Sequence, residues 1–438
     1  LYVGFSRFGS IRLGHTEPEF STKSWVAMLF AAGIGSGMMY WSGIEWAHYI
    51  QAPPFRAEPF SHEAYLWSAS YGLHHWGLIA WAFYCLPTLA IAYPFYVRRI
   101  PQLKYSLSAE YWLRGREASI PARLMDSFFM VALIGGAGSS LGFSTPLIAA
   151  FITRLTGMPT TFFLEMLVVT FCVIIFAVSV WMGLKKGIRR LSDLNIWMSF
   201  VLLSFVLFAG DTLFLLKMAV NSIGFLLQNS LSMIFWTDPI VESDFVGDWT
   251  IFYWAWWIAY GPFVGLFVTR ISKGRSLRQV VVGMLVFGSL GVWLFFLVLG
   301  NHSLSLQLGG TLDVVSVMQT KGGATAIVAG LDELPFAGMI IGLFCLVAVI
   351  FVATTYDSAS YTLAASATQS LAVSEDPPRW HRVFWAIAIA ILPIGLMNAG
   401  GIREAQTATL VVSLPLTLTF WISGVGLMKS LHADQSTA

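Results

Sequence analysis

Ten apolar stretches, each long enough to supply the roughly 20 residues that a helix needs to cross a bilayer, dominate the sequence. Their predicted limits are 24–49, 63–97, 124–153, 160–184, 193–217, 248–270, 277–300, 338–372, 380–398 and 405–428. Hydrophobic residues make up 57% of the 438 residues and charged residues 11%, which excludes a soluble globular protein. We therefore predict an all-α polytopic membrane protein in the lipid bilayer, and nothing indicates a nucleic-acid partner.

The 25 Lys and Arg residues divide unevenly between the two sides of this topology. One set of alternate loops has 20 of them, and the other set has only Arg56, Arg154, Lys217, Lys321 and Arg403. By the positive-inside rule the first set faces the cytoplasm, as do both ends of the ten-helix core. The predicted location is the cell inner (cytoplasmic) membrane, with multiple passes.

Ten spans divide into two groups of five, and because five is odd the second group has inverted topology. The first span of each group contains residues that disfavour a helix, at 33–37 and at Gly261-Pro262. Interrupted helices at corresponding positions of inverted halves indicate a transporter's binding site. We predict one transmembrane transporter domain over 1–438, with a first repeat at 24–217, an interfacial helix at 218–235 and a second repeat at 248–428. Short external helices or loops are expected at 303–335.

A dense aromatic run occupies the sixth predicted span, from Trp249 to Phe267. Lipid-facing helices are normally filled with Leu, Ile and Val, while Trp belongs at the membrane interface. Aromatic faces attract cations, above all a quaternary ammonium, which has no N–H group to satisfy. The run therefore indicates an aromatic cage. A second stripe in the second span, Trp76, Trp81 and Tyr84, either packs between helices or faces the same cage.

Polar and small residues in two other spans suggest how the rest of a ligand is held. Gly33, Gly35 and Gly37 alternate, which favours an unwound helix with free backbone groups over close helix packing. Thr354 and Thr355 in the eighth span offer hydroxyl oxygens of the kind that a hard cation such as Na⁺ prefers, or else they bond between helices. Further candidates are Asp357, near that cation site, and Glu45, which we expect to be buried in a structural or gating role. Cys85, Cys172 and Cys345 are expected to be packing residues.

With these residues in place, the chain resembles the betaine/choline/carnitine transporter (BCCT) family over nearly its whole length. The resemblance rests on residues 5–9, 11–14, 18–21, 33–37, 186–189, 252–257 and 270–276. The Tyr-Trp-Ala-Trp-Trp run at 253–257, followed by Arg-Ile-Ser-Lys-Gly-Arg at 270–275, is the most specific part. Family members usually have two further helices upstream, and this chain begins where the second should end.

The resemblance implies a homotrimer of twelve-helix subunits with the LeuT-like five-plus-five inverted-repeat fold, ten helices of which lie in this chain. It places the substrate's cationic head among Trp256, Trp257 and Tyr260, with Trp76, Trp81 and Tyr84 nearby. Trp249 matches an aromatic residue of the outer path and Phe267 one of the inner path. The backbone N–H groups of Gly33, Gly35 and Gly37 would then meet the substrate's carboxylate.

The matched positions disagree about ion coupling. Ala31, Ile34, Phe351, Thr354 and Thr355 match a sodium site of Na⁺-coupled members. Arg189 matches the arginine that replaces this sodium in sodium-independent carnitine exchangers, and two such cations in one pocket would repel each other strongly. We expect Na⁺ symport, with exchange of carnitine for its metabolites as the alternative.

The predicted function is therefore secondary active import of a small zwitterion or cation by alternating access, without an organic cofactor. Candidate substrates are glycine betaine, carnitine, dimethylsulfoniopropionate and choline, which the sequence does not distinguish, and osmotic regulation is equally undetermined. A channel or an intramembrane enzyme is a remote alternative, because the sequence shows neither polar pore rings nor a nucleophile and base pair at membrane depth.

Overall fold

The computed structural model describes residues 1–436 except 117, 182–184, 241–242, 369–374 and 400–401. These residues are helical in every named element, with one isolated β-bridge between Arg12 and Ser276. The α-helices are α1 (Tyr2–Phe5), α2 (Thr22–Ala32), α3 (Ser36–Tyr49), α4 (His62–Trp76), α5 (Leu78–Ala92), α6 (Glu110–Leu113), α7 (Ile120–Thr156), α8 (Phe162–Trp181), α9 (Lys185–Ala209), α10 (Thr212–Phe235), α11 (Phe252–Ile271), α12 (Leu277–Gly283), α13 (Ser289–Phe295), α14 (Asn301–Gly309), α15 (Val314–Lys321), α16 (Gly323–Asp332), α17 (Ala337–Ala367), α18 (Arg379–Ala399) and α19 (Ile402–Ser436). Short 3-10 helices are η1 (Arg7–Ser10), η2 (Pro54–Arg56) and η4 (Tyr105–Ala109), and π-helical segments are η3 (Tyr93–Val97), η5 (Val246–Ile251), η6 (Met284–Gly288) and η7 (Phe296–Gly300).

Eight helical stretches within the described ranges are long and apolar enough to cross a membrane. They are His62–Val97, Ile120–Thr156, Ser192–Ala209, Thr212–Phe235, Val246–Ile271, Leu277–Gly309, Ala337–Ala367 and Arg403–Asp434. The protein is therefore a polytopic helical membrane protein, as predicted, although the count of ten is not confirmed. The predicted spans at 24–49, 160–184 and 380–398 are not among the eight.

The segment predicted as an interfacial helix at 218–235 begins earlier in the structure, because Asp211 caps α10 through a side-chain bond to the N–H of Phe214. Its length and composition place α10 among the eight membrane-length helices, so its interfacial position stays a prediction. The region at 303–335 forms short helices, as expected: α15, α16 and the greater part of α14.

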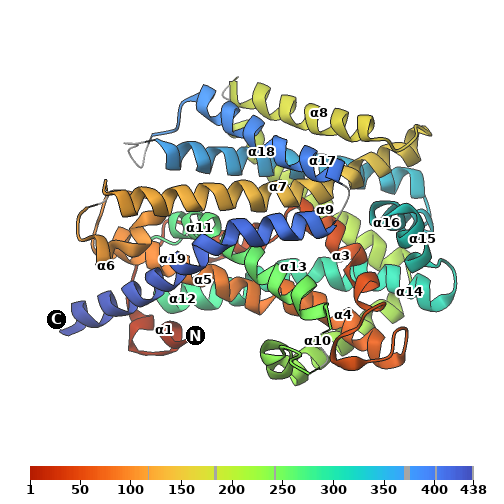
Figure 1. The fold of residues 1–438 in the computed structure, drawn as a ribbon, viewed down its shortest axis with the longest axis horizontal. Coiled ribbons are helices and arrows are strands. Elements are labelled where there is room, and N and C mark those ends of the chain that lie inside the picture. Colours follow the sequence, from red (N-terminus) through yellow and green to blue (C-terminus); the bar gives the residue numbers. More distant parts are fainter. Residues whose placement is uncertain (117, 182–184, 241–242, 369–374, 400–401, 437–438) are drawn as a thin grey trace.

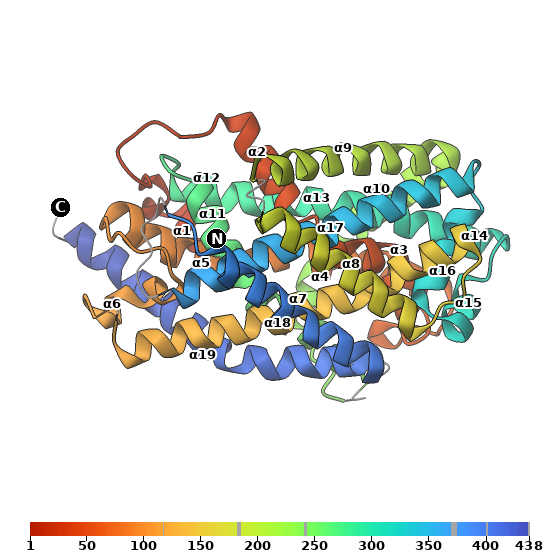
Figure 2. The same cartoon turned by 90° about the horizontal axis from the view of Figure 1, so that it is seen from above.

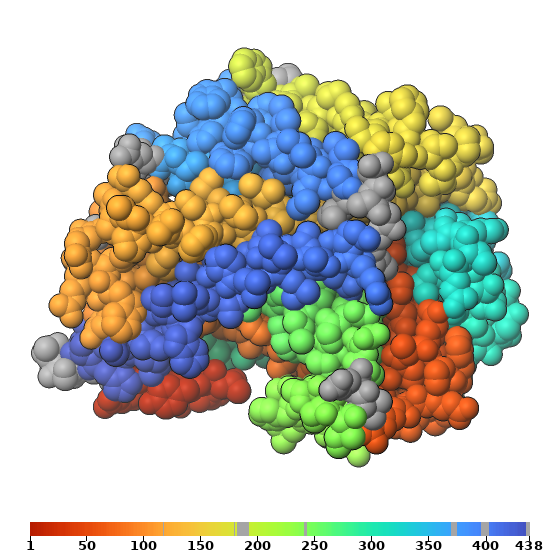
Figure 3. Space-filling view, in the orientation of Figure 1, coloured from red at the N-terminus to blue at the C-terminus, as the bar shows by residue number. Residues whose placement is uncertain are grey.

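The helix α11 lies in the core of the bundle, where it packs against α5, α7 and α19. In Figure 1, α7, α17 and α18 run beside one another through the upper part of the molecule, with α8 along the edge. Figure 2 shows α9 along one edge of the bundle and α19 along the opposite edge. In the space-filling view of Figure 3, α19 (blue) crosses the face directly below α7 (orange).

The predicted interruption of the first span is confirmed. The helix α2 ends at Ala32 and α3 begins at Ser36. Gly35, the N-cap of α3, has an extended backbone with φ −132° and ψ 172° and provides no side-chain cap. The first N–H groups of α3 therefore lack the side-chain acceptor that helix N-termini commonly have.

The sixth span, by contrast, is not interrupted at Gly261-Pro262, and that prediction is wrong. The helix α11 continues through Pro262 to Ile271. A Cβ on Gly261 would lie 2.5 Å from the Phe420 ring of α19, and one on Gly265 would lie 3.0 Å from the backbone nitrogen of Thr88 in α5. The glycines thus let neighbouring helices pack closely, and such neighbours allow a membrane helix to tolerate proline.

The N-terminal segment is fastened to the loop between α11 and α12. The N–H of Leu13 donates to the carbonyl of Arg275 (2.8 Å), and the N–H of Gly274 donates to the carbonyl of Leu13 (2.7 Å). The Arg275 guanidinium also donates to the carbonyl of Phe20 (2.8 Å) and to the Thr22 hydroxyl (3.0 Å), at the start of α2. Gly274 has φ +80°, which favours glycine. The beginning of α2 and the end of α11 are therefore tied together.

Candidate functional site

Three indole rings from α4 and α11 meet in the core and form the centre of the aromatic cluster. The centroid of Trp76 lies 4.9 Å from that of Trp257 and 5.7 Å from that of Trp256, and the last two are 5.6 Å apart. Trp256 and Trp257 are parallel within 3°, whereas Trp76 stands edge-on to both. The three centroids are thus as close to one another as the range of a cation–π contact, about 6 Å from a ring centroid.

Three further predicted residues extend this cluster. Tyr84 lies 5.9 Å from Trp257, Tyr260 lies 6.4 Å from Trp256, and Trp81 lies 5.5 Å from Tyr84, measured between centroids. Trp76, Trp81, Tyr84, Trp256 and Trp257 are all buried. The structure thus brings together every residue predicted for the cage.

The two residues predicted for the transport path are placed differently. Trp249, at the entrance to α11, lies 4.9 Å from Tyr49 and 6.4 Å from Tyr253 between centroids, so it adjoins the cluster through Tyr253. Phe267, near the other end of α11, is 40% exposed, and the structure does not bring it to the cluster. A path role for either residue stays a prediction.

The break between α2 and α3 lies beside the aromatic cluster. A Cβ on Gly33 would be 3.0 Å from the Trp81 ring, and one on Gly37 would be 2.7 Å from the Ser140 hydroxyl of α7. Gly35 has no atom within 4 Å of its Cβ position, so it faces open space. Ser36, the first residue of α3, is 2% exposed, and its hydroxyl has no hydrogen-bond partner. The sequence prediction missed Ser36, although its place between two glycines at the break could have marked it.

A buried carboxylate, Glu45 of α3, adjoins the same cluster and is only 1% exposed. Its Oε2 accepts hydrogen bonds from the indole of Trp76 (2.8 Å) and the hydroxyl of Tyr253 (2.6 Å), and its Oε1 accepts one from the hydroxyl of Tyr49. The expected burial of Glu45 is confirmed. The network links α3, α4 and α11. Trp76 lies 31 positions and Tyr253 lies 208 positions from Glu45 in the sequence, so the sequence pattern alone does not reveal them as its partners.

His75 of α4 continues this network. Its Nδ1 lies 2.8 Å from the hydroxyl oxygen of Tyr49, and its Nε2 lies 3.2 Å from that of Thr250. Its backbone carbonyl accepts the indole N–H of Trp257 at 2.8 Å. His75 therefore contacts both the carboxylate network and the indole cluster.

The residues matched to a sodium site provide oxygen atoms without carboxylates. The hydroxyls of Thr354 and Thr355 both donate to the carbonyl of Phe351, at 3.0 and 2.8 Å. Because their protons are used in these bonds, their lone pairs remain available to a cation. These threonines belong to α17, which packs against α3. Ala31 and Ile34 lie shortly before α3 in the sequence. The donor set fits Na⁺, and the site itself stays a prediction.

Asp357, one turn further along α17, is paired with a cation of the protein. The guanidinium of Arg382 in α18 lies 2.6 Å from its carboxylate and 5.3 Å from the centroid of Tyr361. This pair gives Asp357 a structural role in joining α17 to α18, which removes it as a free ligand for an ion. The side chain of Arg189, the candidate for coupling, lies outside what the structure describes.

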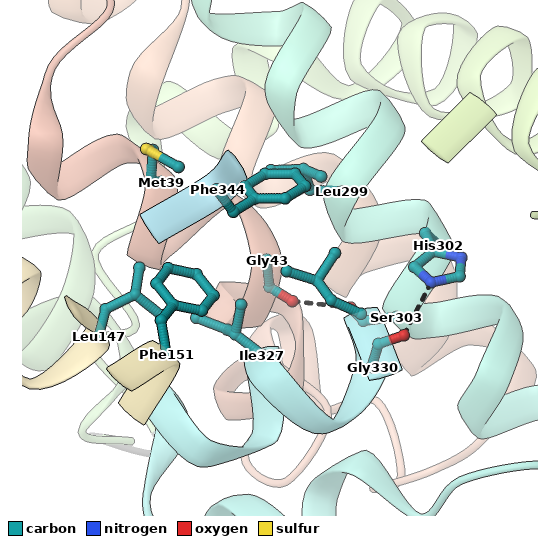
Figure 4. A pocket seen from close by; sticks show the side chains of 11 residues that line it. Met39, Gly43, Leu147, Phe151, Leu299, His302, Ser303, Ile327, Gly330 and Phe344 are labelled. Atoms are coloured by element: carbon teal, nitrogen blue, oxygen red, sulfur yellow. Dashed lines mark hydrogen bonds between the residues drawn. The ribbon is translucent and has the colours of Figure 1, made fainter. Parts of the chain in front are cut away.

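A small cavity of ≈ 20 Å³ lies apart from the cluster, between α3, α7, α14, α16 and α17. Figure 4 shows Met39, Leu147, Phe151, Ile327 and Phe344 around it, with Ser303 bonded to the carbonyl of Gly43 and His302 to that of Gly330. This volume suffices for one water molecule. It is too small for a trimethylated substrate.

A bundle of membrane-length helices with a buried aromatic cluster beside a helix break is the architecture of a membrane transporter. Residues 1–436 match the family model described as BCCT, betaine/carnitine/choline family transporter. The chain belongs to this family, whose members are transporters and not enzymes.

Among similar proteins is the uncharacterized transporter YeaV of Escherichia coli (strain K12), 35% identical over 99% of this chain and 90% of that protein. A carnitine transporter of Acinetobacter baumannii (strain ATCC 19606) is 34% identical over 99% of this chain and 79% of that protein. A solved structure of a Na⁺-coupled sialic acid symporter in a substrate-bound, outward-open state covers 92% of this chain and 84% of its own, with 14% identity and a TM-score of 0.38.

Proposed function

We propose that this transporter imports a small zwitterion with a quaternary ammonium or sulfonium head, by alternating access and coupled to Na⁺. The candidates are glycine betaine, carnitine and dimethylsulfoniopropionate, with choline as a purely cationic substrate. The observation that carries the proposal is the triangle of Trp76, Trp256 and Trp257, whose centroids are 4.9 to 5.7 Å apart. The name of the Acinetobacter baumannii relative supports carnitine among these candidates.

The cluster suits a methylated head better than a primary ammonium ion. A primary ammonium ion needs three acceptors, but the indole N–H groups of this cluster are donors, and each is already bonded. They donate to Glu45, to the carbonyl of Gly136 and to the carbonyl of His75. Such rings offer a cation their faces alone, and a methylated cation requires nothing more.

The carboxylate of a zwitterion needs donors on the other side of the site. The N-terminus of α3 offers N–H groups that have no side-chain cap, together with the positive end of the helix dipole. Ser36 adds a buried hydroxyl with no partner at the first position of the helix. Gly35 keeps this approach open, since nothing lies within 4 Å of its Cβ position. Choline lacks a carboxylate and would forgo these contacts.

For the assembly we propose the arrangement implied by the family. Ten spans of the chain would form a five-plus-five inverted-repeat bundle of the LeuT type, three subunits would associate as a homotrimer, and the location would be the inner membrane. The Na⁺ ligands would be Thr354, Thr355 and the carbonyls of Ala31, Ile34 and Phe351. The free lone pairs of the two threonine hydroxyls support this choice.

Uptake into proteoliposomes tests the proposal directly. The purified full chain would be reconstituted, and uptake of labelled glycine betaine, carnitine, dimethylsulfoniopropionate and choline would be measured with and without an inward Na⁺ gradient. We expect saturable uptake of at least one compound, accelerated by the gradient. If none of the four is taken up or bound, the proposed substrate class is wrong.

A sodium-independent carnitine exchanger is the alternative function, and Arg189 is the residue that favours it. Vesicles loaded with unlabelled carnitine distinguish the two. An exchanger takes up label only when the vesicles are loaded, whether or not Na⁺ is present. A symporter responds to the Na⁺ gradient in empty vesicles.

A further inference from the structure

The carboxylate of Glu45 lies inside the bundle without a basic partner, which requires an explanation. Among the described residues no Lys or Arg forms an ion pair with it, and the nearest basic atom is Nδ1 of His75, at 3.9 Å from Oε1. Burying an unpaired charge is costly. Membrane proteins keep such residues mainly where they bind or move an ion.

The groups that face Glu45 come from three helices. Tyr49 lies one turn away on α3 itself, His75 and Trp76 lie on α4, and Tyr253 lies on α11. Three further titratable rings border these groups. The ring of His48 lies against Trp249, and that of His74 lies against Trp254 and 5.5 Å from His75 between centroids. Tyr71 packs edge-on to Tyr49 and lies 5.2 Å from His75 between centroids. The π-helical segment η7 contributes the apolar ring of Phe296, which lies against Trp76.

The chain of contacts from Thr250 through His75 and Tyr49 to Glu45 has two complete arrangements of hydrogens. In the first, Thr250 donates to Nε2 of His75, Nδ1–H of His75 donates to the Tyr49 oxygen, and Tyr49 donates to an ionised Glu45. In the second, a protonated Glu45 donates to Tyr49, Tyr49 donates to Nδ1, and Nε2–H donates to Thr250. Every contact keeps one hydrogen in both arrangements, and in both the histidine is neutral.

The two arrangements differ by one proton. A proton that reaches Nε2 of His75 drives the hydrogen on Nδ1 to Tyr49 and the hydroxyl hydrogen of Tyr49 to Glu45, so that the charge of the carboxylate disappears. Trp76 and Tyr253 donate to Oε2 throughout, and the indole cluster keeps its support. The network can thus accept or release a proton without breaking.

We propose that Glu45 is a proton-binding site that competes with the cationic head of the substrate; this inference rests on the function proposed above. The ionised carboxylate lies 2.8 Å from the indole nitrogen of Trp76, whose ring belongs to the cluster. A cation held at this cluster would lie near that carboxylate, and in a low-dielectric core the negative charge would attract it. Protonation removes this attraction, and by linkage a bound cation favours release of the proton.

Binding measured against pH tests this competition in the purified full chain. The four compounds named above keep their charge between about pH 5.5 and about pH 8.5, so any change belongs to the protein. In the limit of exclusive competition, the dissociation constant rises by about tenfold for each unit of pH below the midpoint of protonation. Calorimetry in two buffers of different ionisation enthalpy should also detect proton release when the compound binds.

The variants Glu45→Gln and Glu63→Gln form a matched pair. Glu63 on the exposed start of α4 also accepts an indole N–H, that of Trp67 at 3.2 Å, but lies outside the network. We expect Glu45→Gln to bind more weakly than the wild type at neutral pH, with no pH dependence and no proton release, and Glu63→Gln to behave as the wild type. Infrared difference spectra of the wild type should show a protonated carboxyl band that develops on acidification and is absent from Glu45→Gln.

The outcomes separate the two proposals. Binding that persists in the wild type with a constant affinity and no proton release would overturn the proton site and leave the proposed function intact. Failure of all four compounds to bind at any pH would overturn the proposed function. The infrared band tests the proton site without a ligand, and identical spectra of wild type and Glu45→Gln would refute it. Proton release by the wild type needs no variant, so misfolding of Glu45→Gln would not hide the result.

Discussion

Replacing Trp257 by leucine removes one of the three rings that would hold the cation. Trp257 is 5% exposed and lies 4.9 Å from Trp76 between centroids. A cation–π contact in such a desolvated place contributes about 2 kcal/mol, and each 1.4 kcal/mol corresponds to a factor of ten. We therefore expect Trp257→Leu to weaken binding by about 30-fold. In an uptake assay well below half-saturation, the transport rate should fall by a similar factor.

The same change also removes a hydrogen bond, so a matched control is needed. Trp257 donates to the carbonyl of His75 in α4 at 2.8 Å. Trp293 of α13 donates to the carbonyl of Leu73, which is also in α4, at 2.9 Å. Trp293→Leu therefore costs a comparable bond outside the cluster and should leave the affinity unchanged. Trp257→Phe keeps a ring and should lie between the wild type and Trp257→Leu.

Binding is best measured by calorimetry on protein that elutes as a single species in detergent, with whichever of the four compounds the wild type binds. The melting temperature of each variant separates lost stability from lost affinity. A well-folded Trp257→Leu protein with wild-type affinity would refute the aromatic cage.

Three further predictions concern the neighbouring elements. Gly33→Ala places a methyl group within 3.0 Å of two side chains and should destabilise the protein by about 1–3 kcal/mol. The methyl group of Gly35→Ala meets no atom, so this variant should have the melting temperature of the wild type. Equal melting temperatures of the two variants in detergent would contradict this prediction. Asp357→Asn leaves Arg382, which is 7% exposed, without its charged partner. This change should lower the stability of the protein by about 3–5 kcal/mol. Adding Arg382→Gln should restore part of that stability in the same assay. Thr355→Val should raise the Na⁺ concentration for half-maximal uptake with little effect on substrate affinity at saturating Na⁺, and an unchanged Na⁺ dependence would exclude this hydroxyl as a ligand.

The two helices expected to be broken show what sequence alone can predict. Alternating glycines at 33–37 leave a helix little to stabilise it, and the chain does unwind there. Gly261-Pro262 looks equally unfavourable, yet α11 stays intact because the missing side chain makes room for Phe420. The difference lies in what packs against each position, and local sequence contains no such information.

The candidate site could be predicted in part for a similar reason. Aromatic residues at helical spacing mark one face of a helix. The aromatic residues of the second and sixth predicted spans therefore predict that Trp76 lies near Trp256 and Trp257. The partners of Glu45 could not be predicted in this way, because its hydrogen bonds depend on the relative rotation of α3, α4 and α11. A pattern read along one helix specifies its buried face but not which atoms of a second helix oppose it.

The backbone bonds between Leu13 and the loop at 274–275 have a mechanical consequence. Together with the bonds of the Arg275 guanidinium to Phe20 and Thr22, they join the start of α2 to the loop that follows α11. The helix α2 leads to the glycine break, and α11 contains Trp256 and Trp257. Any tilt of α11 must carry α2 with it, or else break these bonds. If α11 tilts during transport, we therefore expect α2 and the indole pair to move together.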